Sequence, residues 1–173
     1  MEYVKHGNSD LNVSRICLGC MGFGDASIEI KNGINGRQHV MNSIDSSLQH
    51  LGMEYVDLYI YHIWDYKTPA EEILEGMNDA VRTGKARYIG IANAYAYQVA
   101  KMNALAEQHG WAKFISVQNH YNLIMREEER EMFPFCREEN IAMTPTSLFR
   151  LQTLAVFAGR LSQVFGAVAA EIR

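Results

Sequence analysis

Cysteine, proline and long apolar runs are scarce in this sequence, and each scarcity narrows the class of protein. The 173 residues include three cysteines and three prolines. Such a sparse, odd set of thiols does not make a disulfide framework, so we expect reduced cysteines. No run of about 18 apolar residues occurs, and the first ten residues lack the regions of a signal peptide. We therefore expect a soluble, cytoplasmic protein.

Charge of one sign is also scarce. Sixteen lysines and arginines face 20 aspartates and glutamates, and the formal net charge is -4. Because neither sign forms a long block, we expect no nucleic-acid or membrane partner. Cys17 and Cys20 form a C-x-x-C pair, but on a strand residues three apart point to opposite faces, which favours buried thiols over a redox or metal site. No set of ligand residues has metal-binding spacing, so we expect no metal.

The chain does contain a regular alternation of strand-like and helix-like segments. Residues 2–15 read as a β-hairpin, because the turn-forming "GNSD" separates two short β-rich runs. Apolar spacing then predicts helices over 37–52, 96–110 and 126–140, the last interrupted by a proline, and strands over 55–62, 86–93, 113–121 and 141–147. A further helix is predicted to start with Thr68 as N-cap, Pro69 at its first position and Glu71 completing a capping box.

Strands separated by single helices indicate a parallel sheet with right-handed crossovers. A doubly wound sheet and a (β/α)8 TIM barrel both fit this order. The barrel is favoured because "GCMGFG" lacks the G-x-G-x-x-G spacing of a dinucleotide-binding turn. We predict an α/β fold, an incomplete (β/α)8 barrel behind an N-terminal hairpin. It forms one domain over 1–173, with the hairpin at 1–15, βα units at 16–150 and a C-terminal helix at 151–173.

Three longer motifs make the sequence recognisable. They read "VSRICLGCMGFG", "SIDSSLQHLGMEYVDLYIYHIWD" and "FISVQNHYNLIMREEEREMFPFC". Together they resemble the aldo-keto reductase family, and its bacterial members in particular, over residues 1–24 and 37–147. The resemblance implies a TIM barrel that reduces small-molecule aldehydes or ketones by hydride transfer from NADPH.

The same resemblance implies roles for five residues. His62 matches the catalytic histidine at the C-terminal end of its strand, where barrel active sites lie. Trp64 matches a residue of the substrate pocket, Asn93 and Gln118 match residues that bind the nicotinamide carboxamide, and Ser147 matches one near the cofactor phosphates. Read without the resemblance, a single histidine at a strand end is more often structural, and the two amides are also explained as polar groups that satisfy loop amides.

Part of the family's catalytic set is missing from the sequence. The family pairs its histidine with an aspartate, a lysine and a proton-donating tyrosine, yet no tyrosine lies between Tyr3 and Tyr55. Lys31 is the one candidate for the lysine, but the "NGING" that follows also reads as an ordinary turn. Thr146 stands where the family carries an aromatic residue that stacks on the nicotinamide. We therefore expect an impaired reductase.

Three alternatives stay open on the sequence alone. The chain is a degenerate or partner-completed member of the family, or the sequence is an incomplete record of a longer enzyme. It is a non-catalytic cofactor-binding or regulatory module on the same scaffold, since a fold does not fix a function. Or it is a half-barrel that assembles with a copy of itself as a homo-oligomer, because an open barrel exposes two strand edges.

Overall fold

The computed structural model describes residues 2–14, 36–62, 64 and 66–146. The elements are β1 (Tyr3–Lys5), β2 (Asn12–Ser14), α1 (Arg37–Leu51), β3 (Val56–Tyr61), α2 (Ala70–Arg82), β4 (Ala86–Ala92), α3 (Ala96–His109), β5 (Phe114–Gln118), the 3-10 helix η2 (Glu127–Glu129), α4 (Met132–Glu138) and β6 (Ala142–Met143). The expectations for the Cys17 and Cys20 pair, Lys31, Ser147 and the helix over 151–173 fall outside the described residues.

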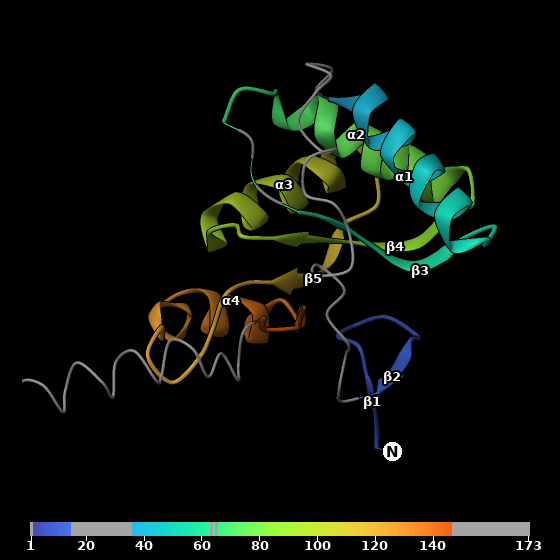
Figure 1. Cartoon of the computed structure of the whole chain (residues 1–173). Helices are drawn as coiled ribbons and strands as arrows, with labels where there is room; N and C mark the ends of the chain where they lie inside the picture. Colours follow the sequence, from blue (N-terminus) through green and yellow to red (C-terminus); the bar gives the residue numbers. More distant parts are fainter. Residues whose placement is uncertain (1, 15–35, 63, 65, 147–173) are drawn as a thin grey trace, which may run out of the picture.

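The strands form two sheets. β1 and β2 pair antiparallel as a hairpin, and β3 to β6 form a parallel sheet in the order β3-β4-β5-β6. In Figure 1, α1, α2 and α3 lie on one side of β3 and β4, and the hairpin lies on the other. The predictions of a parallel α/β fold and an N-terminal hairpin are therefore confirmed, with four parallel strands in the described part of the chain.

The helices form where the apolar spacing predicts them. α1 buries Val40, Ile44 and Leu48 on one stripe and ends at Gly52, whose φ of 63° gives the left-handed C-cap. α2 packs against α1 at Gly76. A Cβ at that position would lie 2.9 Å from the Cα of Arg37, so only glycine lets the two backbones approach this closely.

Two local expectations are wrong. α2 begins at Ala70 with Pro69 as N-cap, and the Pro69 carbonyl accepts the N–H of Glu72 at 3.1 Å. Thr68 is therefore not the N-cap, and the expected capping box does not start this helix. The single helix expected over 126–140 is instead η2 followed by the short α4, with Pro134 in the first turn of α4, where its missing N–H costs nothing.

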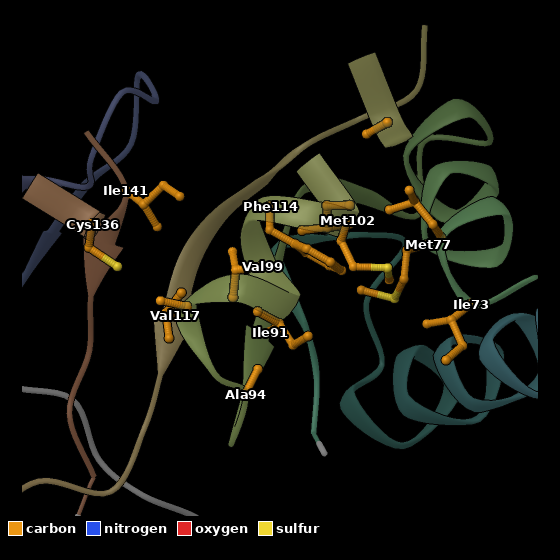
Figure 2. Close-up of a cluster of buried hydrophobic side chains, with 14 of the residues drawn as sticks. Ile73, Met77, Ile91, Ala94, Val99, Met102, Phe114, Val117, Cys136 and Ile141 are labelled. Carbon is orange, nitrogen blue, oxygen red and sulfur yellow. The ribbon is translucent and has the colours of Figure 1, made fainter. Parts of the chain in front are cut away.

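The main core lies between the parallel sheet and its helices. Figure 2 shows Ile73 and Met77 of α2, Val99 and Met102 of α3 and Ile91 of β4 within it. All five side chains are essentially inaccessible to solvent. Burying such side chains contributes about 1.5–3 kcal/mol each relative to leaving them exposed, which holds the strands and helices in register.

The hairpin is seated at the amino ends of the parallel strands. Gly7, at φ 59°, sits so close to β6 that a Cβ there would lie 2.9 Å from the Ala142 nitrogen. Asp10 accepts hydrogen bonds from Arg87 at 3.0 Å and from the Tyr88 hydroxyl at 2.8 Å, both near the start of β4. The opposite side of the sheet, where the parallel strands have their C-terminal ends, is called the carboxyl edge. The loops that follow each strand lie there. Within the described residues, no helix is both long and apolar enough to span a membrane.

Candidate active site

His62, Asn93 and Gln118 lie together at the carboxyl edge of the parallel sheet. His62 directly follows β3, Asn93 directly follows β4, and Gln118 is the last residue of β5. The three strands are neighbours, and Ala92 pairs with Gln118 in the register of β4 and β5. The structure thus brings together three of the residues singled out in the sequence, at the edge where a barrel carries its active site.

Asn93 joins the three strand ends. Its side-chain Nδ2 donates a hydrogen bond to the carbonyl oxygen of His62 at 3.2 Å, and its backbone N–H donates to the carbonyl oxygen of Gln118 at 3.3 Å. The residue adopts φ 52°, a left-handed conformation that asparagine tolerates better than most side chains. His62 and Asn93 are exposed and Gln118 is half-buried, so a ligand can reach all three.

Trp64 lies beside this edge. Its indole is half-buried and packs against the main core cluster, which includes Ala94 in the loop after β4. A half-buried aromatic ring that packs against apolar side chains is suited to the wall of a pocket. The strand edge continues to Thr146, which bridges to His120, whereas Ser147 lies outside the described residues.

Asn119 is a buried polar residue of this edge that the sequence analysis missed. Only 3% of it is exposed. Its Oδ1 accepts the Ala94 N–H at 3.2 Å, and its Nδ2 donates to the Ala94 carbonyl at 2.8 Å and to Oε2 of Glu128 at 3.0 Å. Its own carbonyl accepts the N–H of Thr146 at 2.9 Å. The residue therefore links the loops after β4, β5 and β6.

Asn122 fixes the next turn of the same loop. Its Oδ1 accepts the backbone N–H groups of Ile124 and Met125, each at 2.9 Å, and its Nδ2 lies 3.0 Å from Nε2 of His120. Such an Asx-type turn explains why asparagine stands here. Both asparagines lie in the run "NHYN" directly after β5, which marks a polar loop but does not show which groups they bind.

A cavity of about 410 Å³ lies next to this edge, between Ala94 and the start of α4. Glu127, Glu128 and Glu131 line it, with a single cation, Arg130. An excess of carboxylates repels the phosphates of a dinucleotide. The cavity is therefore unsuited to the pyrophosphate of a cofactor, and the amide groups of the strand ends are the better match for a neutral ring.

Two partly shielded tyrosines near the sheet have raised pKa values. Burial raises the pKa of Tyr59 to about 12, and its hydroxyl lies 3.4 Å from the carbonyl oxygen of Val40, on the helix side of the sheet. The pKa of Tyr121 is also raised, chiefly because its hydroxyl donates to Glu129 at 2.6 Å. A tyrosine that donates a proton near neutrality needs the opposite shift, toward a lower pKa.

The charged groups beside Tyr121 are held in one arrangement. Arg126 contacts Glu129 at 2.6 Å through Nε and at 2.9 Å through its second nitrogen, and it is the first cause of the lowered pKa of that carboxyl. The pair is exposed, so its contribution to the free energy of unfolding is small. Within residues 2–14, 36–62, 64 and 66–146, no group of three histidine, cysteine or acidic side chains is arranged to hold a metal ion.

Comparison with known proteins gives an independent view of the chain. Residues 26–165 match the sequence model of the Aldo/keto reductase family. The versiconal hemiacetal acetate reductase of Aspergillus parasiticus is 44% identical over 111 residues, which cover 64% of this chain and 32% of that protein. An aldo-keto reductase of Fusarium vanettenii is 42% identical over 109 residues, which cover 63% of this chain and 30% of the relative.

A third relative, an aldo-keto reductase of Metarhizium robertsii, is 40% identical over 109 residues, covering 63% of this chain and 30% of the relative. These three relatives are fungal, so the expected likeness to bacterial members in particular is corrected. The matched part of the chain spans about a third of the length of these curated relatives.

Proposed function

Because the chain belongs to the aldo/keto reductase family, we propose that its parent activity is the NADPH-dependent reduction of an aldehyde or ketone. The carboxyl edge of the sheet would supply the nicotinamide side of that site. One observation carries the proposal: His62, Asn93 and Gln118 end three adjacent parallel strands and are joined through Asn93.

The chemistry of these side chains fits the two reactants. NADPH supplies the hydride, and its carboxamide carries one acceptor and two donors, which side-chain amides can match in both directions. The Asn93 amide uses one N–H on His62, so two of its three hydrogen-bonding functions fit the carboxamide. The imidazole of His62 donates a hydrogen bond to the substrate carbonyl oxygen, orienting and polarising it.

Trp64 would form the substrate wall. A half-buried indole takes up the apolar part of a small carbonyl compound while the polar end faces His62. The Aspergillus relative is named for the reduction of versiconal hemiacetal acetate. For this chain we propose only the broader class, a small-molecule aldehyde or ketone.

We further propose that the 173-residue chain is a slow enzyme. The proton-donating tyrosine is missing from the sequence between Tyr3 and Tyr55, and a general acid contributes typically about 10²- to 10⁴-fold in rate. Thr146 also replaces the aromatic ring that would stack on the nicotinamide. Binding of the cofactor would therefore survive better than turnover.

The experiment is a pair of measurements on the same chain. A fluorescence titration with NADPH tests cofactor binding, and the loss of NADPH absorbance with a simple aldehyde tests turnover. We expect saturable binding and weak turnover that His62→Ala abolishes. No binding at millimolar NADPH refutes the proposed site, and rapid turnover refutes the proposed impairment.

A non-catalytic cofactor-binding or regulatory module is the second candidate. The sequence favours it, because no tyrosine lies between Tyr3 and Tyr55 and Thr146 stands where the family carries an aromatic residue. The same two measurements separate the candidates. A module binds NADPH with no aldehyde-dependent turnover at all, and His62→Ala then changes no rate.

Two further features stand as predictions: the chain forms a single domain, and it is cytoplasmic. Assembly of an incomplete barrel with a second copy stays an open alternative. The four described parallel strands leave β3 paired only with β4 within the described residues, and exposed strand edges favour pairing with another chain. Light scattering tests this, and a strict monomer at high concentration refutes self-assembly.

A further inference from the structure

We propose that Asn119 is a positioning residue of the nicotinamide site: its buried side chain holds the backbone that carries Asn93 and Gln118 in the geometry that the cofactor requires. This inference rests on the proposed function. Asn119 directly follows Gln118 in sequence, and its side chain holds Ala94, which directly follows Asn93. The Asn119 side chain thus fixes the residue that follows Asn93, and Asn119 is itself the residue that follows Gln118.

The hydrogen bonds of Asn119 leave its side chain little freedom. Its one acceptor oxygen takes the Ala94 N–H, and its nitrogen donates to the Ala94 carbonyl and to Glu128. The bond to the Glu128 carboxylate is charge-assisted and therefore stronger than a neutral one. Because 3% of the residue is exposed, water cannot replace these bonds cheaply.

Clamping both polar groups of Ala94 fixes the peptide planes on each side of it. The plane that precedes Ala94 contains the carbonyl of Asn93, so the clamp also sets the backbone of Asn93. Asn93 adopts the left-handed φ of 52°, one of several backbone conformations open to asparagine, and the clamp on Ala94 holds the chain in it. Loss of the clamp would release that conformation and with it the direction of the Asn93 amide.

The backbone of Asn119 also contacts the next strand end. The Asn119 carbonyl accepts the N–H of Thr146 at 2.9 Å, and Asn93 donates its own N–H to the carbonyl of Gln118. Hydrogen bonds therefore join Asn93 to His62 and to Gln118, and the neighbouring residue Asn119 is bonded to Thr146, so the ends of all four strands are connected.

The chain offers a matched control at the other end of β5. Asn103 makes the same two-way clamp on a backbone, accepting the Phe114 N–H at 2.8 Å and donating to the Phe114 carbonyl at 3.1 Å. Phe114 begins β5, whereas Gln118 ends it. The substitution Asn103→Ala therefore removes two comparable hydrogen bonds from the other end of the same strand and changes nothing at its carboxyl end.

The experiment compares Asn119→Ala with Asn103→Ala in the full 173-residue chain. NADPH affinity is measured by fluorescence titration, thermal unfolding gives the stability of each variant, and NMR hydrogen exchange follows the Ala94 amide. We expect both variants to lower Tm. Asn119→Ala should weaken NADPH binding on the order of 10-fold and speed exchange at Ala94, whereas Asn103→Ala should leave both nearly unchanged.

A second variant separates positioning from simple loss of packing. Glu128→Gln keeps an acceptor for the Asn119 Nδ2 but removes the charge, so it should weaken NADPH binding less than Asn119→Ala does. Equal losses of affinity in Asn119→Ala and Asn103→Ala, or unchanged affinity in Asn119→Ala, overturn the inference. If the unmodified chain binds no NADPH, the proposed function fails. Exchange at Ala94 then decides the positioning role alone: faster exchange confined to Asn119→Ala supports it, and equal exchange overturns it.

Discussion

The side-chain amide of Asn93 donates a hydrogen bond to the backbone carbonyl of His62 across 3.2 Å. The two residues follow neighbouring strands and are 31 positions apart in the chain. Since the bond uses the His62 backbone, the imidazole itself stays available for a ligand. The proposed cofactor ligand and the proposed catalytic histidine are therefore held in one geometry before any reactant binds.

The first prediction separates the amide of Asn93 from its backbone conformation. Asn93→Gly keeps the left-handed φ without strain and removes only the side chain, so it should weaken NADPH binding with little loss of stability. Asn93→Ala should weaken binding as well and cost about 1–2 kcal/mol of unfolding free energy, because alanine resists that conformation. Fluorescence titration and urea unfolding measure the two effects.

Asn140 is the control for this pair. It has φ 54° and is exposed, and it lies at the amino end of β6, away from His62. Asn140→Gly should leave NADPH binding unchanged. If Asn93→Gly binds NADPH as the unmodified chain does, the Asn93 amide does not contact the cofactor.

A second prediction concerns the thiol of Cys136. Burial first, and then the charge of Glu128, raise the pKa of this thiol to about 12, and 2% of the residue is exposed. The thiolate is the reactive form, so Cys136 should resist iodoacetamide at pH 8 in the folded protein and react once guanidinium unfolds it. Peptide mapping by mass spectrometry reads this site alone. Rapid alkylation in the folded state would show that α4 does not pack as described.

The hairpin should make stability depend on pH. Burial lowers the pKa of His6 below its ordinary value of 6.5, so the folded chain favours the neutral imidazole. Below pH 6.5 the unfolded chain binds this proton more readily than the folded one. Stability is therefore complete above pH 6.5 and is lost as the pH falls from there through the lowered pKa. Urea unfolding at pH 7.5, 6.5 and 5.5 measures the loss.

A variant at His6 tests the assignment of that pH effect. His6→Leu should flatten the dependence between pH 7.5 and 5.5, since no proton is then taken up on unfolding. His109→Gln is the control, because that ring is exposed and stacks on Trp111 at a centroid distance of 4.4 Å. If the stability of His6→Leu depends on pH as strongly as that of the unmodified chain, another group causes the dependence.

Gly90 should be intolerant of any side chain. A Cβ there would lie 3.0 Å from the carbonyl oxygen of Ser116 and 3.2 Å from its Cβ, at the register shift between β4 and β5. Gly90→Ala should therefore cost about 1–3 kcal/mol, typical of overpacking a close contact. Chemical denaturation measures this, and an unchanged midpoint would mean that β4 and β5 are farther apart than described.

The fold could be predicted because each element carries its own local pattern. Val40, Ile44 and Leu48 repeat at helical spacing, and the glycine after them ends the helix, so α1 needed no tertiary information. The start of α2 was predicted one residue too early. Thr68, Pro69 and Glu71 have the spacing of a capping box that follows Thr68, although Pro69 is the N-cap in the structure. Only the hydrogen bond from Glu72 to the Pro69 carbonyl decides which residue caps.

The candidate site was only partly predictable for a related reason. His62, Asn93 and Gln118 were placed by resemblance, and parallel strands bring their ends together without further information. Asn119 was not found, because its partners Ala94 and Glu128 are 25 and 9 residues away and its role exists only once the loops are folded. Residues whose function is to hold other residues leave little trace in a single sequence.

An NMR titration of the 173-residue chain with NADPH tests the central claim most directly. It follows the side-chain amides of Asn93 and Gln118 and the ring of His62, with the Asn103 amide as an internal reference. We predict saturable shifts at the first three groups and none at Asn103. Shifts confined to other parts of the chain, or none at millimolar NADPH, would contradict the proposal that this edge of the sheet binds a nicotinamide.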